Sequence, residues 1–219
     1  MKGISEFINN DFKPLDSNAS VAEAQDFFAQ EAFSHFPVID QNVYIGSLSA
    51  EDVETFDPQK PLGQYRYAME GFFGRPDMLW LDAMELFAQH QTNVLPILDK
   101  DNAYAGYCEA TDIIKLFHDT PFLKEPGSVL IVEKSMHDYS MSQVVQIVES
   151  NNSKVLGLMV SEMQGSMVQV LLKVSLGSLN EIIQSFRRYD YEVVSEHPED
   201  AYINNLKERS DYLDKYLNI

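Results

Sequence analysis

Along the chain, segments whose apolar residues have helical spacing are followed by short apolar runs typical of strands. This succession predicts a mixed α/β protein. Between positions 20 and 30, the apolar residues have the spacing of one helix face. Two short apolar runs follow, Pro37–Asp40 and Val43–Gly46, and the polar pair at 41–42 between them indicates strands joined by a tight turn. A second helix is expected from about Asp52. The residues of the first helix face are Val21, Ala24, Phe27 and Phe28.

The same pattern returns 59 residues later, which indicates an internal repeat. Its helix face is followed by a second Pro-containing strand that begins at Pro96, again seven residues after the helix. The second turn is one residue longer than the first, so the offset becomes 60. The chain therefore contains two copies of a helix, strand, turn, strand and helix. The matched helix positions are Trp80, Ala83, Leu86 and Phe87.

The repeat resembles a tandem pair of CBS domains. The signature of that family is an apolar-Pro-apolar-apolar-Asp strand, a turn, a second strand, and then Gly-x-x-[Thr/Ser]-x-x-Asp at the start of a helix. The first copy matches this signature in full, whereas the second copy has Glu109 at the hydroxyl position. The residues at the Gly, Thr/Ser and Asp positions are Gly46, Ser49 and Asp52 in the first copy, and Gly106, Glu109 and Asp112 in the second.

This resemblance implies that residues 1–124 form one pair with pseudo-two-fold symmetry. The copies are expected at about 10–57 and 64–123, with two clefts between them. The first strand of the second copy is expected within Tyr67–Phe73.

The last third of the chain predicts a different domain at residues 127–197, after the helix-breaking segment Glu125–Gly127. Its elements follow the order β-α-β-β-α-β, which is the ferredoxin-like arrangement. Each helix is expected to begin at a capping box, one at Ser140 and one at Ser178. A hairpin turn is expected at Met163–Ser166. The expected strands are Ser128–Glu133, Val155–Glu162, Met167–Val174 and Tyr191–Ser195.

This order after a CBS pair resembles an ACT-like domain, and the whole layout resembles the acetoin-utilisation-type regulatory proteins. Ligand-binding ACT domains carry an Asp-x-x-Gly-type turn, whereas the turn Ser135–Ser140 here has Asp138 but no glycine. We therefore expect this domain to serve assembly. Residues 198–219 have the pattern of a C-terminal helix that packs either on its own domain or on a partner. Its a/d positions are Ile203, Leu206, Ser210, Leu213 and Leu217.

Charge and composition narrow the range of functions. Lys and Arg number 16 against 34 Asp and Glu, giving a formal net charge of −18. Such an acidic protein repels phosphate backbones and anionic membranes, so neither nucleic acid nor a membrane is an expected partner. The single cysteine, Cys108, excludes an internal disulfide. No signal peptide and no apolar run near the ~20 residues of a membrane span is evident, so we expect a cytoplasmic protein.

Catalytic and metal-binding signatures are missing from the sequence. It contains no GxSxG, GxGxxG, GxxxxGK[ST], HExxH or CxxC motif, and its five histidines are scattered. We therefore expect no enzyme, no catalytic residue, no metal site and no tightly bound cofactor.

The helix start at Ser49 and Asp52 has two interpretations. Ser-x-x-Asp is a helix-capping pattern in its own right. The family resemblance adds a ligand, AMP, ADP or ATP, with Ser49 near the phosphate, Asp52 on the ribose and adenine against Pro37 and Val38. The equivalent residues of the second cleft are Pro96, Gly106, Glu109 and Asp112.

The carboxylate of Glu109 would repel a phosphate in the second cleft. We therefore expect that cleft to prefer a ligand with little phosphate charge, to stay empty, or to require Mg²⁺ as a bridge.

These expectations converge on a regulatory protein that senses an adenine nucleotide and signals to an unknown partner. The alternative is a scaffold or interaction protein that binds no ligand. A homodimer is expected in both cases, because both domain types resemble modules that self-associate.

Overall fold

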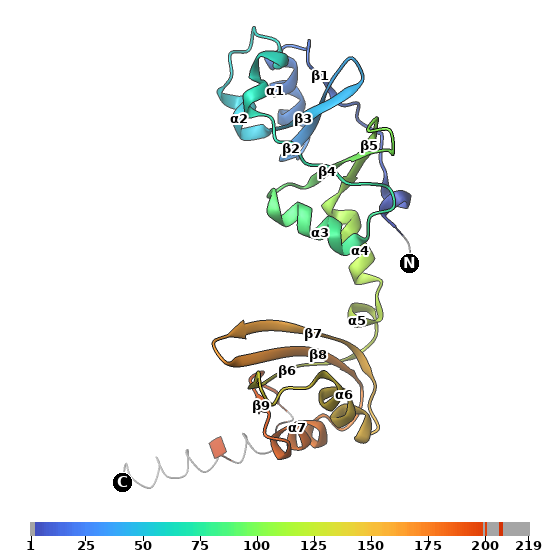
Figure 1. Cartoon of the computed structure of the whole chain (residues 1–219), viewed down its shortest axis with the longest axis vertical. Coiled ribbons are helices and arrows are strands. Elements are labelled where there is room, and N and C mark those ends of the chain that lie inside the picture. Colours follow the sequence, from blue (N-terminus) through green and yellow to red (C-terminus); the bar gives the residue numbers. More distant parts are fainter. Residues whose placement is uncertain (1–2, 199, 201–205, 208–219) are drawn as a thin grey trace, which may run out of the picture. The chain divides into compact units, whose positions relative to one another are not determined.

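The computed structural model describes residues 3–198, 200 and 206–207 (Figure 1). The chain divides into two compact units between Phe117 and His118, and each is described by itself. Within the described residues, no helix has both the length and the apolar character needed to cross a membrane.

The first unit contains two similar halves. The elements of the first half are η1 (Ile4–Phe7), β1 (Leu15–Asp16), α1 (Val21–Gln30), β2 (His35–Asp40), β3 (Val43–Ser49), α2 (Ala50–Thr55) and η2 (Leu62–Ala68). Those of the second half are α3 (Trp80–Gln89), β4 (Val94–Leu98), β5 (Tyr104–Glu109) and α4 (Ala110–His118). In each half, two antiparallel strands lie between two helices, as the repeat predicts.

The two hairpins share their irregularities as well as their register. In each hairpin the register of pairing shifts next to the motif glycine. The shift lies between Val38 and Ile39 in the first hairpin, and between Ile97 and Leu98 in the second. The glycines at these positions, Gly46 and Gly106, have φ values of +136° and +139°. Residues with a Cβ atom rarely adopt this backbone conformation, which explains why glycine occupies both positions.

The strand expected within Tyr67–Phe73 does not form, so that prediction is wrong. Tyr67 lies in the 3₁₀-helix η2, and the following segment makes only isolated bridges, from Glu70 to Ser47 and from Gly74 to Ile97. Two glycines in the segment, at 71 and 74, weaken its strand propensity. The equivalent strand β1 of the first half is itself only two residues long and pairs in parallel with β2.

The two halves are related by a pseudo-two-fold axis, which confirms that part of the predicted fold. A residue close to such an axis contacts the residue at the equivalent position of the other half. Ser34 and Asn93, 59 positions apart, do so through three hydrogen bonds, and Val43 pairs with Ala103 at the other end. Between these contacts, buried Phe36, Val94 and Tyr107 form a shared core.

Asn93→Ala is expected to lower the free energy of unfolding of the first unit by about 1–2 kcal/mol. The Asn93 side chain accepts from the Ser34 backbone N–H and hydroxyl, and donates to the carbonyl of Ala32 at 2.7 Å. Urea unfolding followed by the fluorescence of Trp80, the single tryptophan, measures this loss. A double-mutant cycle with Ser34→Ala should be non-additive, and full additivity would contradict the contact.

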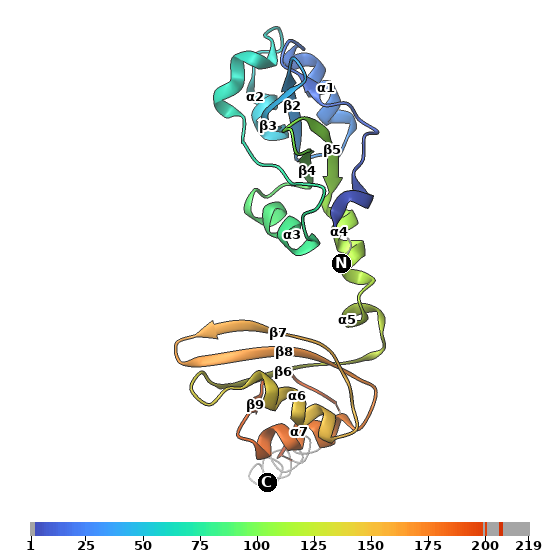
Figure 2. The same ribbon diagram turned by 45° about the vertical axis from the view of Figure 1, so that its right-hand side comes forward.

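The second unit contains a four-stranded antiparallel sheet in the order β7-β8-β6-β9. This is the ferredoxin-like order, and helices α6 and α7 lie on one face of the sheet (Figure 2). The core between sheet and helices includes Leu130, Val170, Ile183 and Phe186. The elements are α5 (Pro121–Lys124), β6 (Gly127–Ser135), α6 (Met141–Ser150), β7 (Val155–Gln164), β8 (Met167–Ser175), α7 (Leu179–Arg188) and β9 (Glu192–Val193).

Local details of this unit differ from the sequence-based expectations. Ser140 and Ser178 occupy the N-cap positions, but neither side chain caps its helix. The Ser140 hydroxyl instead lies 2.8 Å from that of Ser142. The last strand is shorter than Tyr191–Ser195, because the Tyr191 ring packs into the core and the Ser195 hydroxyl replaces a backbone carbonyl as acceptor for the N–H of Ile131. The predicted C-terminal helix at 198–219 lies outside the described residues, except for residues 198, 200, 206 and 207.

Candidate functional site

A cavity of about 590 Å³ in the first unit is lined by two of the three signature residues of the first copy, Ser49 and Asp52. Its wall combines the start of β2, the junction of β3 and α2, the connection before α3, and the C-terminal end of α3. The two halves therefore both contribute to it. The lining residues are Ser34, His35, Ser49, Ala50, Glu51, Asp52, Glu70, Gln89, His90 and Gln91.

Ser49 and Asp52 lie next to each other because Ser49 is the N-cap of α2. The Ser49 hydroxyl oxygen accepts from the backbone N–H of Asp52 at 3.0 Å, and the N–H of Ala50 donates to the carbonyl of Ser34. The capping interpretation is thus confirmed. A hydroxyl that accepts one hydrogen bond still has a proton to donate, so capping leaves Ser49 able to contact a ligand.

Two histidines and a glutamate form a cluster in this cavity that sequence reasoning missed. Nδ1 of His90 lies 3.3 Å from Oε2 of Glu70, and Nε2 of His35 lies 3.9 Å from Oε1 of the same carboxylate. The ring of Phe72 stacks on His90 at a centroid distance of 4.3 Å. One sequence signal was available: the repeat places Val94 opposite His35 and Glu31 opposite His90, so the histidines belong to one cleft only.

Burial lowers the pKa of the His35 imidazole below its ordinary value of 6.5, while Glu70 and Asp52 oppose this shift and His90 adds to it. The unfolded chain therefore binds the His35 proton more tightly than the folded chain. We expect wild-type stability to fall as the pH falls below about 6.5, more steeply than in His35→Gln. Urea unfolding between about pH 7.5 and pH 5 compares the two proteins, and parallel curves would contradict the shift.

The other residues predicted for the first cleft lie behind the cavity wall. Pro37 and Val38 are buried in β2, and Gly46 is buried in β3. None of the three is among the described residues that line the cavity. These residues position the hairpin, and direct contact between them and a ligand remains a prediction.

The second copy places its signature residues in the same local arrangement. Pro96 lies in β4 and Gly106 in β5, and the N–H of Ala110 donates to the carbonyl of Asn93 as Ala50 does to Ser34. Glu109 ends β5, and Asp112 lies in the first turn of α4.

The contacts around the second pair are nevertheless different. Oε2 of Glu109 accepts from the Thr111 hydroxyl at 3.4 Å, and Oδ1 of Asp112 lies 3.3 Å from Nζ of Lys115. A lysine therefore already contacts the carboxylate that is predicted to hold a ribose. Phe33, at the position equivalent to Thr92, packs its ring against Phe12 and Tyr107.

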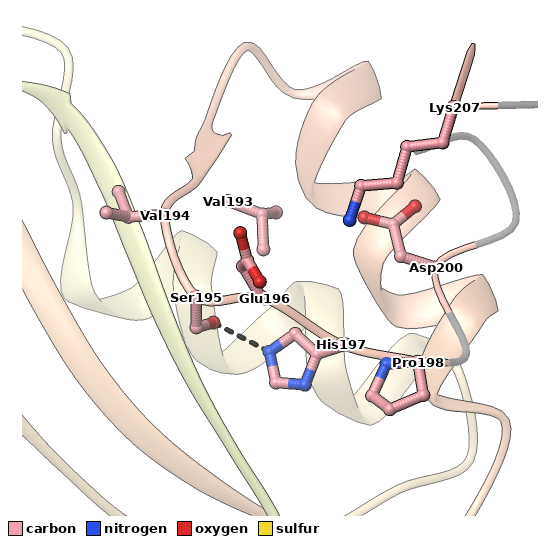
Figure 3. A pocket seen from close by; sticks show the side chains of 8 residues that line it. All are labelled: Val193, Val194, Ser195, Glu196, His197, Pro198, Asp200 and Lys207. Carbon is pink, nitrogen blue, oxygen red and sulfur yellow. Dashed lines mark hydrogen bonds between the residues drawn. The ribbon is translucent and has the colours of Figure 1, made fainter. Parts of the chain in front are cut away.

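Ser195 and Cys108 are of types that can act as nucleophiles, but their surroundings give each of them a structural role. A cavity of about 400 Å³ lies after β9, and in it Oγ of Ser195 is 2.6 Å from Nε2 of His197. The dashed line in Figure 3 marks this contact. The same oxygen accepts from the N–H of Ile131, so the hydroxyl holds the end of the sheet. Cys108 is fully buried, and burial raises the pKa of its thiol to about 12, which makes it a poor nucleophile.

The family model of the CBS domain matches residues 4–56 and 75–119. A CBS domain-containing protein of Bacillus subtilis, YhcV, is 29% identical over 108 residues, which are 47% of this chain and 76% of that protein.

Two solved structures are also similar. A CBS domain pair/ACT domain protein of Thermotoga maritima has 20% identity and a TM-score of 0.48, covering 52% of this chain and 95% of that one. CBSX2 in complex with AMP has 18% identity and a TM-score of 0.45, covering 53% and 96%. The two family-model matches fall on the two halves of the first unit, each of which contains one of the duplicated hairpins, so this unit has the fold of a CBS domain pair.

Proposed function

We propose that the cavity at Ser49 and Asp52 binds an adenine nucleotide and that the chain is a regulatory protein. CBS domain pairs commonly bind adenosine nucleotides in regulatory roles. The observation that carries the proposal is the position of Ser49 and Asp52 on one wall of a cavity whose opposite wall comes from the other copy. A ligand in this position touches both halves, so its binding can change how they pack.

The chemistry of the two side chains suits the two polar parts of a nucleotide. The Asp52 carboxylate can accept from both ribose hydroxyls, since an ionised carboxylate offers about four acceptor sites. The Ser49 hydroxyl, already oriented by the N–H of Asp52, can donate to a phosphate oxygen. Adenine is expected against β2, whose Pro37 and Val38 lie directly behind the cavity wall.

Isothermal titration calorimetry of the full chain with AMP, ADP and ATP tests this proposal. We expect a saturable signal with at least one of them. A heat-denatured sample of freshly purified protein should also release an adenine nucleotide. Absence of both signals would refute nucleotide binding.

The second cleft is expected to differ because of Glu109. In the background Asp52→Ala, Glu109→Thr should strengthen metal-free ATP binding at least about threefold, since it replaces a carboxylate by a hydroxyl. Added Mg²⁺ should reduce this difference, because the metal can bridge Glu109 and a phosphate. Equal metal-free affinities in the two proteins would show that Glu109 does not control the cleft.

The alternative function is a dimeric scaffold or interaction protein that binds no ligand, and it is favoured by the second unit. For this unit we propose an ACT-like domain, in a layout of the acetoin-utilisation type. Strand side chains alternate between faces, so the face opposite the helices presents Val129, Ile131, Met159 and Leu171. Val129 and Met159 are more than two fifths exposed. We expect light scattering to give a homodimer, and a mass near 25.0 kDa at all concentrations would exclude it.

A further inference from the structure

The cavity at Ser49 and Asp52 has an unusual set of charges for a phosphate-binding site. Three carboxylates line it, those of Glu51, Asp52 and Glu70, together with the imidazoles of His35 and His90. Among the described residues of this lining, none is lysine or arginine. At neutral pH a phosphate therefore meets carboxylates without a permanent cation to offset them, whereas a ribose and an adenine meet no such repulsion.

We infer that this cavity discriminates among adenine ligands by the charge at the 5′ position. It favours an uncharged adenine nucleoside at neutral and higher pH, and it binds a 5′-phosphate more tightly when His35 takes up a proton. This inference rests on the proposed function and names Glu70 as the residue that sets the specificity.

Glu70 has this role because its carboxylate lies between the two imidazoles. His90 contacts one oxygen at 3.3 Å and His35 approaches the other at 3.9 Å. The glutamate side chain is half exposed, so it is free to change position when a ligand enters. A phosphate that enters must compete with Glu70 for the same two imidazoles, and this competition turns toward the ligand when the His35 ring is cationic.

The carboxylates near His35 favour its protonated form, but burial opposes them and has the larger effect. His35 faces Glu70, Asp52, Glu51 and His90, and its Nδ1 lies 3.2 Å from the Ser34 hydroxyl. His90 faces Glu70 and stacks on the ring of Phe72. Burial keeps the pKa of His35 below its ordinary value, so this ring is neutral at pH 7 without a ligand. A phosphate next to it adds a negative charge that favours the protonated form.

The test is calorimetry of the full chain with adenosine and AMP at about pH 6 and about pH 8. We expect AMP to bind about tenfold more tightly at the lower pH, while adenosine changes less than about threefold. AMP itself titrates near pH 6, so the gain is measured against the double variant His35→Gln/His90→Gln. This variant binds the same AMP, so it should keep only the part of the gain that comes from the titration of AMP itself. Repeating the titration in buffers of different ionisation enthalpy counts the protons taken up.

A second arm removes the specificity residue. Glu70→Gln should strengthen AMP binding about tenfold at about pH 8 and leave adenosine unchanged. The matched control is Glu54→Gln, an exposed residue of α2 that does not line the cavity, and it should change neither ligand.

The outcomes separate the inference from the proposed function. Equal binding of adenosine and AMP at both pH values, or the same effect of Glu70→Gln and Glu54→Gln, would overturn the inference while nucleotide binding stands. Failure of both ligands to bind at both pH values would overturn the proposed function and the inference with it.

Discussion

Gly106→Ala is expected to destabilise the first unit by about 3 kcal/mol or more. Gly106 has a φ of +139°, which strains any L-residue, and an added Cβ would lie 2.6 Å from the carbonyl oxygen of Asn9. That carbonyl accepts from the N–H of Tyr107, and the N–H of Asn9 donates back to Tyr107. The methyl group therefore requires the chain at Asn9 to move and breaks this pair of hydrogen bonds.

Urea unfolding followed by the fluorescence of Trp80 measures the loss, because this residue packs in the first unit against Phe117. The matched control is Gly71→Ala, since a Cβ there would meet no atom within 4 Å and the backbone has no positive φ. Gly46→Ala should also destabilise, with its Cβ 2.8 Å from the side chain of Met69. Equal stability of the Gly106 and Gly71 variants would contradict the strained conformation.

Asp52→Ala is expected to weaken adenine nucleotide binding at least about tenfold, because it removes a charged acceptor worth about 1.5–3 kcal/mol. The variant also removes a negative charge from a carboxylate-rich cavity, which would favour a phosphate. Adenosine is therefore the sharper probe, since it has the ribose but no phosphate.

The control for this experiment is Glu54→Ala, on the same helix but outside the cavity lining. Thermal melting of both variants checks the helix, because the N–H of Asp52 is the donor in the Ser49 cap. If adenosine binds Asp52→Ala and wild type equally well, Asp52 is not the ribose residue.

The fold of the first unit could be predicted because its repeat is carried by residues with strict backbone requirements. Proline in a strand, glycine at positive φ and serine at a helix start restrict the local structure wherever they occur. The segment at 67–74 pairs only through one bridge from Glu70 to Ser47 and one from Gly74 to Ile97. The second bridge lies 59 residues after the pair Leu15 and Val38, but a single bridge has no alternating apolar pattern by which the sequence could indicate a strand.

The candidate site also has one part that the sequence could predict and one part that it could not. Ser49 and Asp52 are three positions apart, so helix geometry alone brings them together. His35, Glu70 and His90 come from a strand, a connection and the end of a helix, and only the packing of the two copies joins them. Contacts of this kind depend on tertiary structure, and the acid–base properties of the cavity follow from them.

The contact between Ser34 and Asn93 has a consequence for the history of the molecule. If two identical chains met at a two-fold axis, one substitution would change both sides of the contact, and the pair would always be matched. After duplication within one chain, each side can change alone. A hydroxyl now faces an amide, so the contact joins unlike side chains from the two copies. Duplication therefore made a lasting asymmetry possible, and the two clefts could acquire different ligands.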